Sequence, residues 1–143
     1  MHKGLELMKK LVQAYDTQCK PLCQELKLPK TAFDILMFLG NNPEYKTAAD
    51  IVEVRGIKAN LVSINVEKLV KEGLLVREAD PTDRRKVRLS CTKKALPIIE
   101  KGRKMQEAFQ QALFAHTDEE TMQIFVKTLS VMNSNMDTIL EGE

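Results

Sequence analysis

The stretch of sequence that decides the fold is Asp83-Arg84-Arg85-Lys86-Val87-Arg88-Leu89-Ser90-Cys91-Thr92, together with the preceding Lys71-Glu72-Gly73-Leu74-Leu75-Val76-Arg77. Gly73 is typical of a residue that ends a helix, and residues 74–77 have the composition of a short strand. Three cations at 84–86 follow a turn and lead into a second strand, 86–91. Thr92 can then cap a new helix. This order of a helix, a cationic hairpin and another helix predicts a winged helix.

The second strand alternates polar and apolar residues, which predicts an inner face made of Val87, Leu89 and Cys91. Apolar residues at helical spacing predict helices before the hairpin. We expect a long first helix that continues through Pro21, a second over 29–40 and a third over 47–55. The third begins with a capping-box pattern, in which Thr47 is followed by Asp50.

The helix before the hairpin separates into two faces. One face is apolar and is formed by Val62, Val66, Leu69 and Val70. The other face is polar and presents Asn60, Ser63, Glu67 and Lys71. After the hairpin, the pattern predicts a helix from Thr92 to about Phe114 and a last helix that is capped at Thr117.

Composition limits the classes of protein that fit. A chain of 143 residues, 43% of them hydrophobic, is expected to form one domain with its own core. No signal peptide and no apolar run of about 18 residues is found, and three cysteines without a repeated spacing fit a reducing compartment, so we expect a cytoplasmic protein without a membrane span. We also expect no cofactor.

Charge is distributed unevenly along the chain, although the net charge is only +2. Residues 55–94 hold 11 Lys and Arg against 5 acids, whereas residues 106–143 hold Lys127 against 7 acids. A basic middle and an acidic end predict one surface for an anionic partner and another for a different contact.

These segments resemble the MarR family of transcription regulators. The resemblance rests on Asp83-x-Arg85 followed by Val87, Leu89 and Thr92, and on Leu69-x-x-x-Gly73-Leu74-x-x-Arg77 before it. It implies a single mainly α domain over 1–143 with a small two- or three-stranded antiparallel wing. A winged helix-turn-helix lobe would occupy about 29–92, and about 1–27 and 93–143 would form long N- and C-terminal dimerisation helices.

The resemblance also implies a homodimer that binds a pseudo-palindromic double-stranded DNA operator, most simply as a repressor. Candidate base-reading residues lie in the first turns of the recognition helix and are Lys58, Ala59, Asn60, Ser63 and Ile64. Candidate phosphate contacts are Thr47, Lys68 and Arg77. At the wing, the cations Arg84, Arg85 and Lys86 are expected to reach a minor groove, and Asp83 to position them. The alternative is that these cations only solvate a turn.

A small phenolic or lipophilic effector is implied as well. The side chains that we expect near its pocket are Tyr15, Cys19, Phe33 and Met37, for each of which an ordinary core position is the alternative. The dimer interface is expected to include Leu5, Met8, Leu113, Phe125, Leu129 and Met132.

No catalytic or metal-binding motif is found, so we do not expect an enzyme. Cys19 and Cys23 lie one helical turn apart, a spacing poorly suited to a direct disulfide. Two alternatives to a DNA-binding regulator remain open at this stage. One is a winged helix used for protein contact without a DNA target, and the other is a thiol-based redox sensor.

Overall fold

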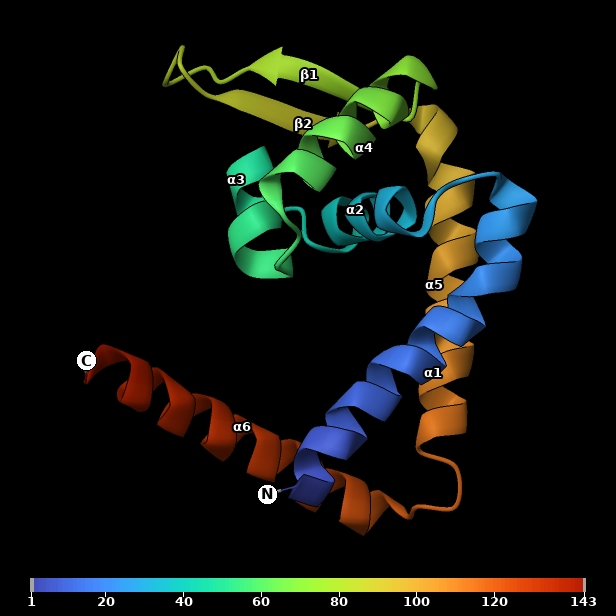
Figure 1. The fold of residues 1–143 in the computed structure, drawn as a ribbon, viewed down its shortest axis with the longest axis vertical. Helices are drawn as coiled ribbons and strands as arrows, with labels where there is room; N and C mark the ends of the chain where they lie inside the picture. Colours follow the sequence, from blue (N-terminus) through green and yellow to red (C-terminus); the bar gives the residue numbers. More distant parts are fainter. Residues whose placement is uncertain (1, 143) are drawn as a thin grey trace. The chain divides into compact units, whose positions relative to one another are not determined.

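The structure is a computed structural model that describes residues 2–142. It consists of two compact units, Met1–Phe109 and Gln110–Glu143, and each is described by itself. In chain order the elements are α1 (His2–Leu26), α2 (Lys30–Asn41), α3 (Ala48–Asp50) continued by the π-helical turn η1 (Ile51–Arg55), α4 (Ala59–Lys71), β1 (Leu75–Ala79), β2 (Val87–Cys91), the 3₁₀ turn η2 (Lys93–Ala95), α5 (Leu96–Leu113) and α6 (Glu119–Glu141) (Figure 1). This confirms a mainly helical fold with a two-stranded antiparallel wing.

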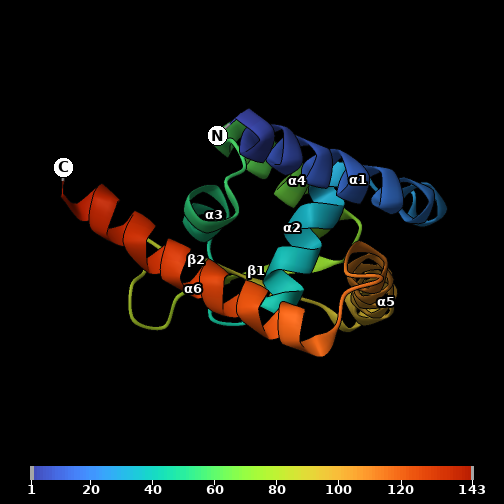
Figure 2. The same cartoon turned by 90° about the horizontal axis from the view of Figure 1, so that it is seen from below.

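Helix α2 is the centre of the first unit. Seven of its twelve residues are buried, because apolar side chains point in nearly every direction from this helix. It packs against α1, α4 and β2, and Figure 2 shows it running between α1 and the strands. The largest fully buried side chains around it are Phe33, Ile35, Leu36, Ile51, Leu69 and Leu75.

A glycine lets α5 approach α2 closely. A Cβ atom at Gly102 would overlap the thioether of Met37 and lie 3.3 Å from Cε1 of Phe33. Protein interiors are closely packed, so there is no spare room for an added methyl group. Only glycine fits at position 102 unless the Met37 side chain moves.

The wing is a regular hairpin whose turn points away from α5 in both views (Figures 1 and 2). Its strands pair in register from Leu75 opposite Cys91 to Ala79 opposite Val87. The backbone N–H of Leu89 also donates to the carbonyl of Lys46, 2.7 Å away, which ties β2 to the segment before α3. The base of the wing is therefore held from both sides.

Several local predictions are confirmed. The capping box of α3 is present, with the Thr47 side chain and the Asp50 backbone 3.1 Å apart, and α1 runs through Pro21. Gly73 follows the end of α4 as predicted, with a left-handed φ angle of 75°, where other residues are strained. Gly56 ends η1 in the same way, with a φ angle of 78°.

Three local predictions are wrong. Thr117 does not cap the last helix; Asp118 does, and the Thr117 hydroxyl donates to the carbonyl of Phe114 instead. Thr92 stands at the start of η2 but makes no capping bond, because its hydroxyl donates to the carbonyl of Gly73 at 2.6 Å. Val87 is 49% exposed rather than internal, since it lies at the tip end of the hairpin.

The second unit contains α6, of which none of the described residues is buried. Its apolar side chains include Phe125, Leu129 and Met132, which are 41%, 46% and 50% exposed. The ring of Phe125 lies 5.6 Å from that of Phe114. Among residues 2–142, no helix is long and apolar enough to cross a membrane.

Candidate nucleic-acid interface and adjacent cavity

The wing tip carries the three predicted cations on exposed positions. The side chain of Arg85 is 92% exposed, although it forms an ion pair with Asp83. The Asp83 carboxylate accepts from the Arg85 backbone N–H at 3.0 Å and lies 3.4 Å from its Nε. This geometry is compatible with the positioning role predicted for Asp83, because the carboxylate contacts both the backbone and Nε of Arg85 while the side chain stays 92% exposed.

Asp80 organises the wing turn, a role that the sequence analysis did not assign to it. One carboxylate oxygen accepts from the hydroxyl and backbone N–H of Thr82 at 2.7 and 2.8 Å and from the N–H of Asp83 at 3.2 Å. The other lies 3.2 Å from Nε of Arg88 on β2. The hydrogen bonds from Thr82, assisted by Arg88, hold the pKa of Asp80 well below its ordinary range. The sequence signal was the Asp-Pro pair at the turn, which favours such side-chain bonds.

Helix α4 presents the predicted reading surface. Lys58, Ala59, Asn60, Ser63 and Ile64 are all exposed. The opposite side is buried, with Val62, Val66 and Leu69 at 1%, 5% and 0% exposure. Asn65 is buried as well, which the pattern did not predict, and its amide is satisfied by donating to the carbonyl of Leu61 at 2.8 Å.

All three predicted phosphate contacts make bonds within the lobe. Arg77 on β1 donates to the Glu67 carboxylate at 2.8 Å, so it links the wing to α4, and this bond lowers the pKa of Glu67. Lys68 lies 3.0 Å from Glu72, one turn along the same helix. Thr47 accepts the capping bond of α3. Their contact with phosphate remains a prediction.

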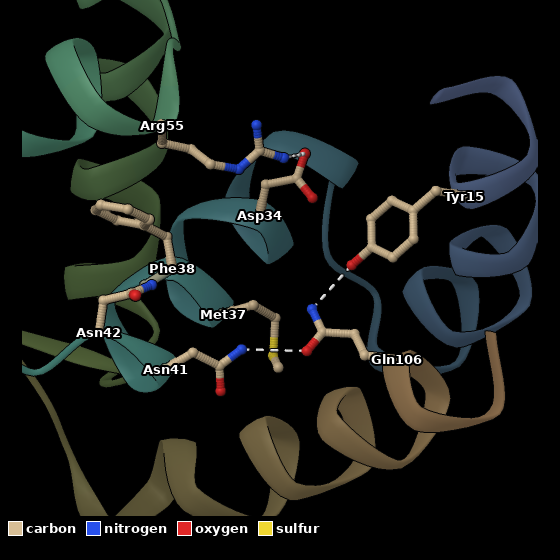
Figure 3. Close-up of a pocket in the computed structure, with 8 residues that line it drawn as sticks. All are labelled: Tyr15, Asp34, Met37, Phe38, Asn41, Asn42, Arg55 and Gln106. Carbon is tan, nitrogen blue, oxygen red and sulfur yellow. Dashed lines mark hydrogen bonds and ion pairs between the residues drawn. The ribbon is translucent and has the colours of Figure 1, made fainter. Parts of the chain in front are cut away.

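A cavity of about 180 Å³ lies within the first unit, between α1, α2, η1 and α5 (Figure 3). Its lining residues are Tyr15, Asp34, Met37, Phe38, Asn41, Asn42, Arg55 and Gln106. Of the four residues predicted near a pocket, Tyr15 and Met37 line this cavity, whereas Cys19 and Phe33 are fully buried in the core. Six of the eight lining side chains are polar, although the predicted effector was phenolic or lipophilic.

A chain of hydrogen bonds crosses one wall of the cavity. Gln106 donates to the Tyr15 hydroxyl at 2.9 Å and accepts from Asn41 at 3.1 Å, and Asn41 accepts in turn from Arg103 at 2.9 Å. Figure 3 shows the first two of these bonds as dashed lines. Burial raises the pKa of Tyr15 to about 12, and the bond from Gln106 opposes this only in part.

The cysteines are reduced, and their surroundings disfavour the reactive thiolate form. Cys19 and Cys23 are buried, Cys91 is half-buried, and burial raises the pKa of each thiol. Among the described residues, no group of three or more His, Cys, Asp or Glu side chains could hold a metal ion.

The buried three-helix core, the cationic hairpin and the exposed face of α4 define a winged helix-turn-helix protein. Residues 26–86 match the model of the MarR family. This match confirms the resemblance predicted from the wing and the recognition helix. No curated protein matches the sequence.

Solved structures with the same fold cover most of the chain. A MarR transcriptional regulator from Methanosarcina mazei Go1 has a TM-score of 0.82 and 19% identity, covering 97% of this chain and 99% of its own. A MarR family transcriptional regulator from Listeria monocytogenes, complexed with a 26mer DNA, has a TM-score of 0.81 and 18% identity. The match covers 92% of this chain and 87% of the Listeria chain. CouR from Rhodococcus jostii RHA1, bound to p-coumaroyl-CoA, has a TM-score of 0.68 and 17% identity. The match covers 89% of this chain and 86% of the CouR chain. These similarities establish the fold.

Replacing Asp80 with Asn should loosen the wing turn, because the carboxylate charge that attracts Thr82, Asp83 and Arg88 is lost. We expect faster amide exchange at Thr82 and Asp83 and little change at Leu89, measured by NMR. Glu78→Gln, on an exposed carboxylate of the same hairpin, is the matched control. Because the pKa of Asp80 is lowered, its contribution is present above the ordinary Asp pKa of about 3.9 and is lost as pH falls toward the lowered value. Equal exchange in both variants would show that Asp80 does not organise the turn.

Tyr15 should ionise about two pH units above an ordinary tyrosine, at about 12 rather than 10.0. The measurement is an absorbance titration of Tyr45→Phe, which leaves Tyr15 as the remaining tyrosine. Since the folded-state pKa is raised, the stabilising contribution of neutral Tyr15 is full below pH 10 and is lost as pH rises through about 12. A midpoint near 10 in the folded protein would contradict the buried environment of Tyr15.

Proposed function

We propose that this chain is a cytoplasmic, sequence-specific DNA-binding transcription regulator, most simply a repressor. The observation that carries the proposal is the exposed cationic wing tip beside the exposed face of α4, in a lobe that matches the MarR family. Cations at a hairpin tip suit the narrow minor groove, and short polar side chains at the start of a helix suit base edges in the major groove. The DNA-bound Listeria relative of the same fold supports this use of the lobe.

The regulator acts as a homodimer on a pseudo-palindromic operator. Support comes from the apolar side chains left exposed on α6 and on the N-terminal half of α1, where Leu5 and Met8 are 60% and 65% exposed. Soluble monomers rarely expose apolar patches of this kind, and symmetric dimers are the commonest way to cover them. Two-fold symmetry would present two recognition helices to half-sites about one helical turn apart.

A small molecule modulates DNA binding by occupying the cavity between α1, α2, η1 and α5. Its volume of about 180 Å³ corresponds to roughly six water molecules of the liquid, so it suits a ligand of about one substituted ring. The polar lining favours a ring with polar substituents over a purely lipophilic compound. The ligand-bound CouR structure supports small-molecule binding by proteins of this fold.

Arg85→Ala should weaken binding to duplexes that the wild-type protein selects from a random pool. We expect a loss of about 1–3 kcal/mol, or about 5- to 150-fold in Kd, because a guanidinium in the minor groove is removed. Gel-shift titration at fixed salt measures this, with Lys104→Ala as a control at an exposed cation of α5.

The wild-type affinity should also fall steeply between low and moderate salt, because cations that contact phosphates release counterions. Failure of the wild-type protein to bind any duplex, or binding independent of salt, would contradict the proposal. Such a result would favour a winged helix that contacts another protein.

Met132→Glu should disrupt the dimer, since it places a charge on the exposed apolar face of α6. We expect a shift toward the monomer mass in size-exclusion chromatography with light scattering. Ser134→Glu, which adds the same charge on the opposite side of this helix, should leave the mass unchanged. A wild-type protein that is already monomeric would refute the dimer.

A further inference from the structure

Three successive carbonyl groups at the end of α4 are bonded to one short segment that follows the wing. The carbonyl of Glu72 accepts from the ammonium group of Lys94 at 2.8 Å. The carbonyl of Gly73 accepts from the hydroxyl of Thr92 at 2.6 Å, and the backbone N–H of Thr92 donates to the carbonyl of Leu74 at 3.1 Å. The last carbonyls of a helix have no partners inside the helix, so these three bonds satisfy them from outside. We call the three bonds the C-terminal clasp of α4.

The bonds made by α4 itself do not replace the clasp. Gly73, at a φ angle of 75°, donates to the carbonyl of Val70 at 3.0 Å. Leu74 donates to the carbonyl of Leu69 at 2.9 Å. Together these two bonds form a Schellman motif, which satisfies carbonyls of the preceding turn but not those of residues 72 and 73. The end of the helix therefore depends on partners from another element.

The clasp attaches α4 to a fixed part of the core. Lys94 belongs to η2, which continues directly into α5. Ala95 and Ile99, the next buried residues of this segment, are 0% and 2% exposed. The aliphatic part of Lys94 passes over Gly73, since a Cβ atom at that glycine would lie 3.8 Å from Cδ of Lys94. The ammonium group also lies at the end of α4 where the helix dipole favours a cation.

The opposite end of α4 has no comparable attachment. Its N-cap Lys58 makes no side-chain capping bond, and Ala59 and Asn60 in the first turn are exposed. The helix has 13 residues and is therefore about 20 Å long. Since a helix of this length moves largely as a rigid body, a displacement of its C-terminal end also displaces its first turns. The position of the reading surface thus depends in part on how the far end of α4 is held.

We propose that Lys94 is a positioning residue for the reading surface of α4, and that it acts through the carbonyl of Glu72 rather than by contacting DNA. The inference rests on the proposed DNA-binding function and adds to it a residue outside the candidate contacts named above. Hydrogen bonds to base edges form only within a distance range of about 0.5 Å, whereas attraction to the phosphate backbone tolerates small displacements. Loss of the Lys94 bond therefore weakens binding to a selected sequence and leaves non-specific binding unchanged.

Amide hydrogen exchange without DNA tests the clasp. Lys94→Met keeps most of the side-chain volume and removes the ammonium donor. We expect exchange at Gly73 and Leu74 to rise about two- to tenfold, the effect of losing one hydrogen bond. Lys94→Arg keeps a cationic donor and should retain slow exchange. Lys93→Met removes the same charge from the preceding residue of η2 and should also leave these amides unchanged.

Circular dichroism should show all three variants to be folded, because both lysines are exposed. Unchanged exchange in Lys94→Met would overturn the clasp. An equal rise in Lys93→Met or in Lys94→Arg would overturn it as well, since the effect would then not depend on a cationic donor at position 94.

Gel-shift titration separates positioning from phosphate contact. The probes are a duplex that the wild-type protein selects from a random pool and a duplex of the same composition in scrambled order. For Lys94→Met, we expect the affinity for the selected duplex to fall about two- to tenfold. The affinity for the scrambled duplex and the slope of log Kd against log salt should not change. Lys94→Arg and Lys93→Met should keep the wild-type ratio of the two affinities.

A phosphate contact by Lys94 would instead weaken binding to both duplexes equally and reduce the salt slope by about one. That result would overturn the positioning role. Full retention of selective binding by Lys94→Met would also overturn it, while leaving the DNA-binding function intact. A wild-type protein that binds no duplex would refute the function itself, and the exchange measurements would then still decide whether Lys94 holds the end of α4.

Discussion

The burial of α2 is the constraint on which the other features of the first unit depend. Because seven of its side chains lie in the core, α1, α4 and β2 must each pack against a different part of the same helix. Its polar residues are confined to the few remaining positions, and Asp34 and Asn41 are two of them. Both line the cavity. The apolar faces of α2 therefore position the winged-helix lobe, and two of its polar residues contribute to the cavity wall.

Ion pairs inside the lobe neutralise part of the positive charge of the basic segment, residues 55–94. Arg77 and Arg88 belong to this segment, but each is paired with a carboxylate of the lobe and helps to hold the wing in place. The tip cations are more exposed, although the Asp83 carboxylate lies 3.4 Å from Nε of Arg85. A count of basic residues thus overstates the charge available to a partner, because part of that charge serves the structure. Three exposed cations, Arg84, Arg85 and Lys86, lie next to one another at the hairpin turn.

Short-range patterns were sufficient to predict the elements and much of the proposed interface. The Thr47–Asp50 capping box, the glycines that end helices and the two faces of α4 depend on neighbours within about one helical turn, and all are found. Residues that act through distant partners were missed or misassigned. Glu67 bonds to Arg77, and Asp34 pairs with Arg55. The two residues of each pair belong to different elements, so the periodicity of a single helix or strand could not predict the contact. The capping role of Thr92 failed for the same reason, since its hydroxyl serves the end of α4 rather than its own helix.

The size of the cavity also depends on Gly102, a residue that does not line it. Met37 touches the surface of this glycine and also forms part of the cavity wall. A methyl group added on α5 would displace the flexible thioether and so alter the volume available beside Tyr15. Variation at this one helical position is thus a route by which related sequences could acquire binding sites of different sizes while every wall residue stays the same.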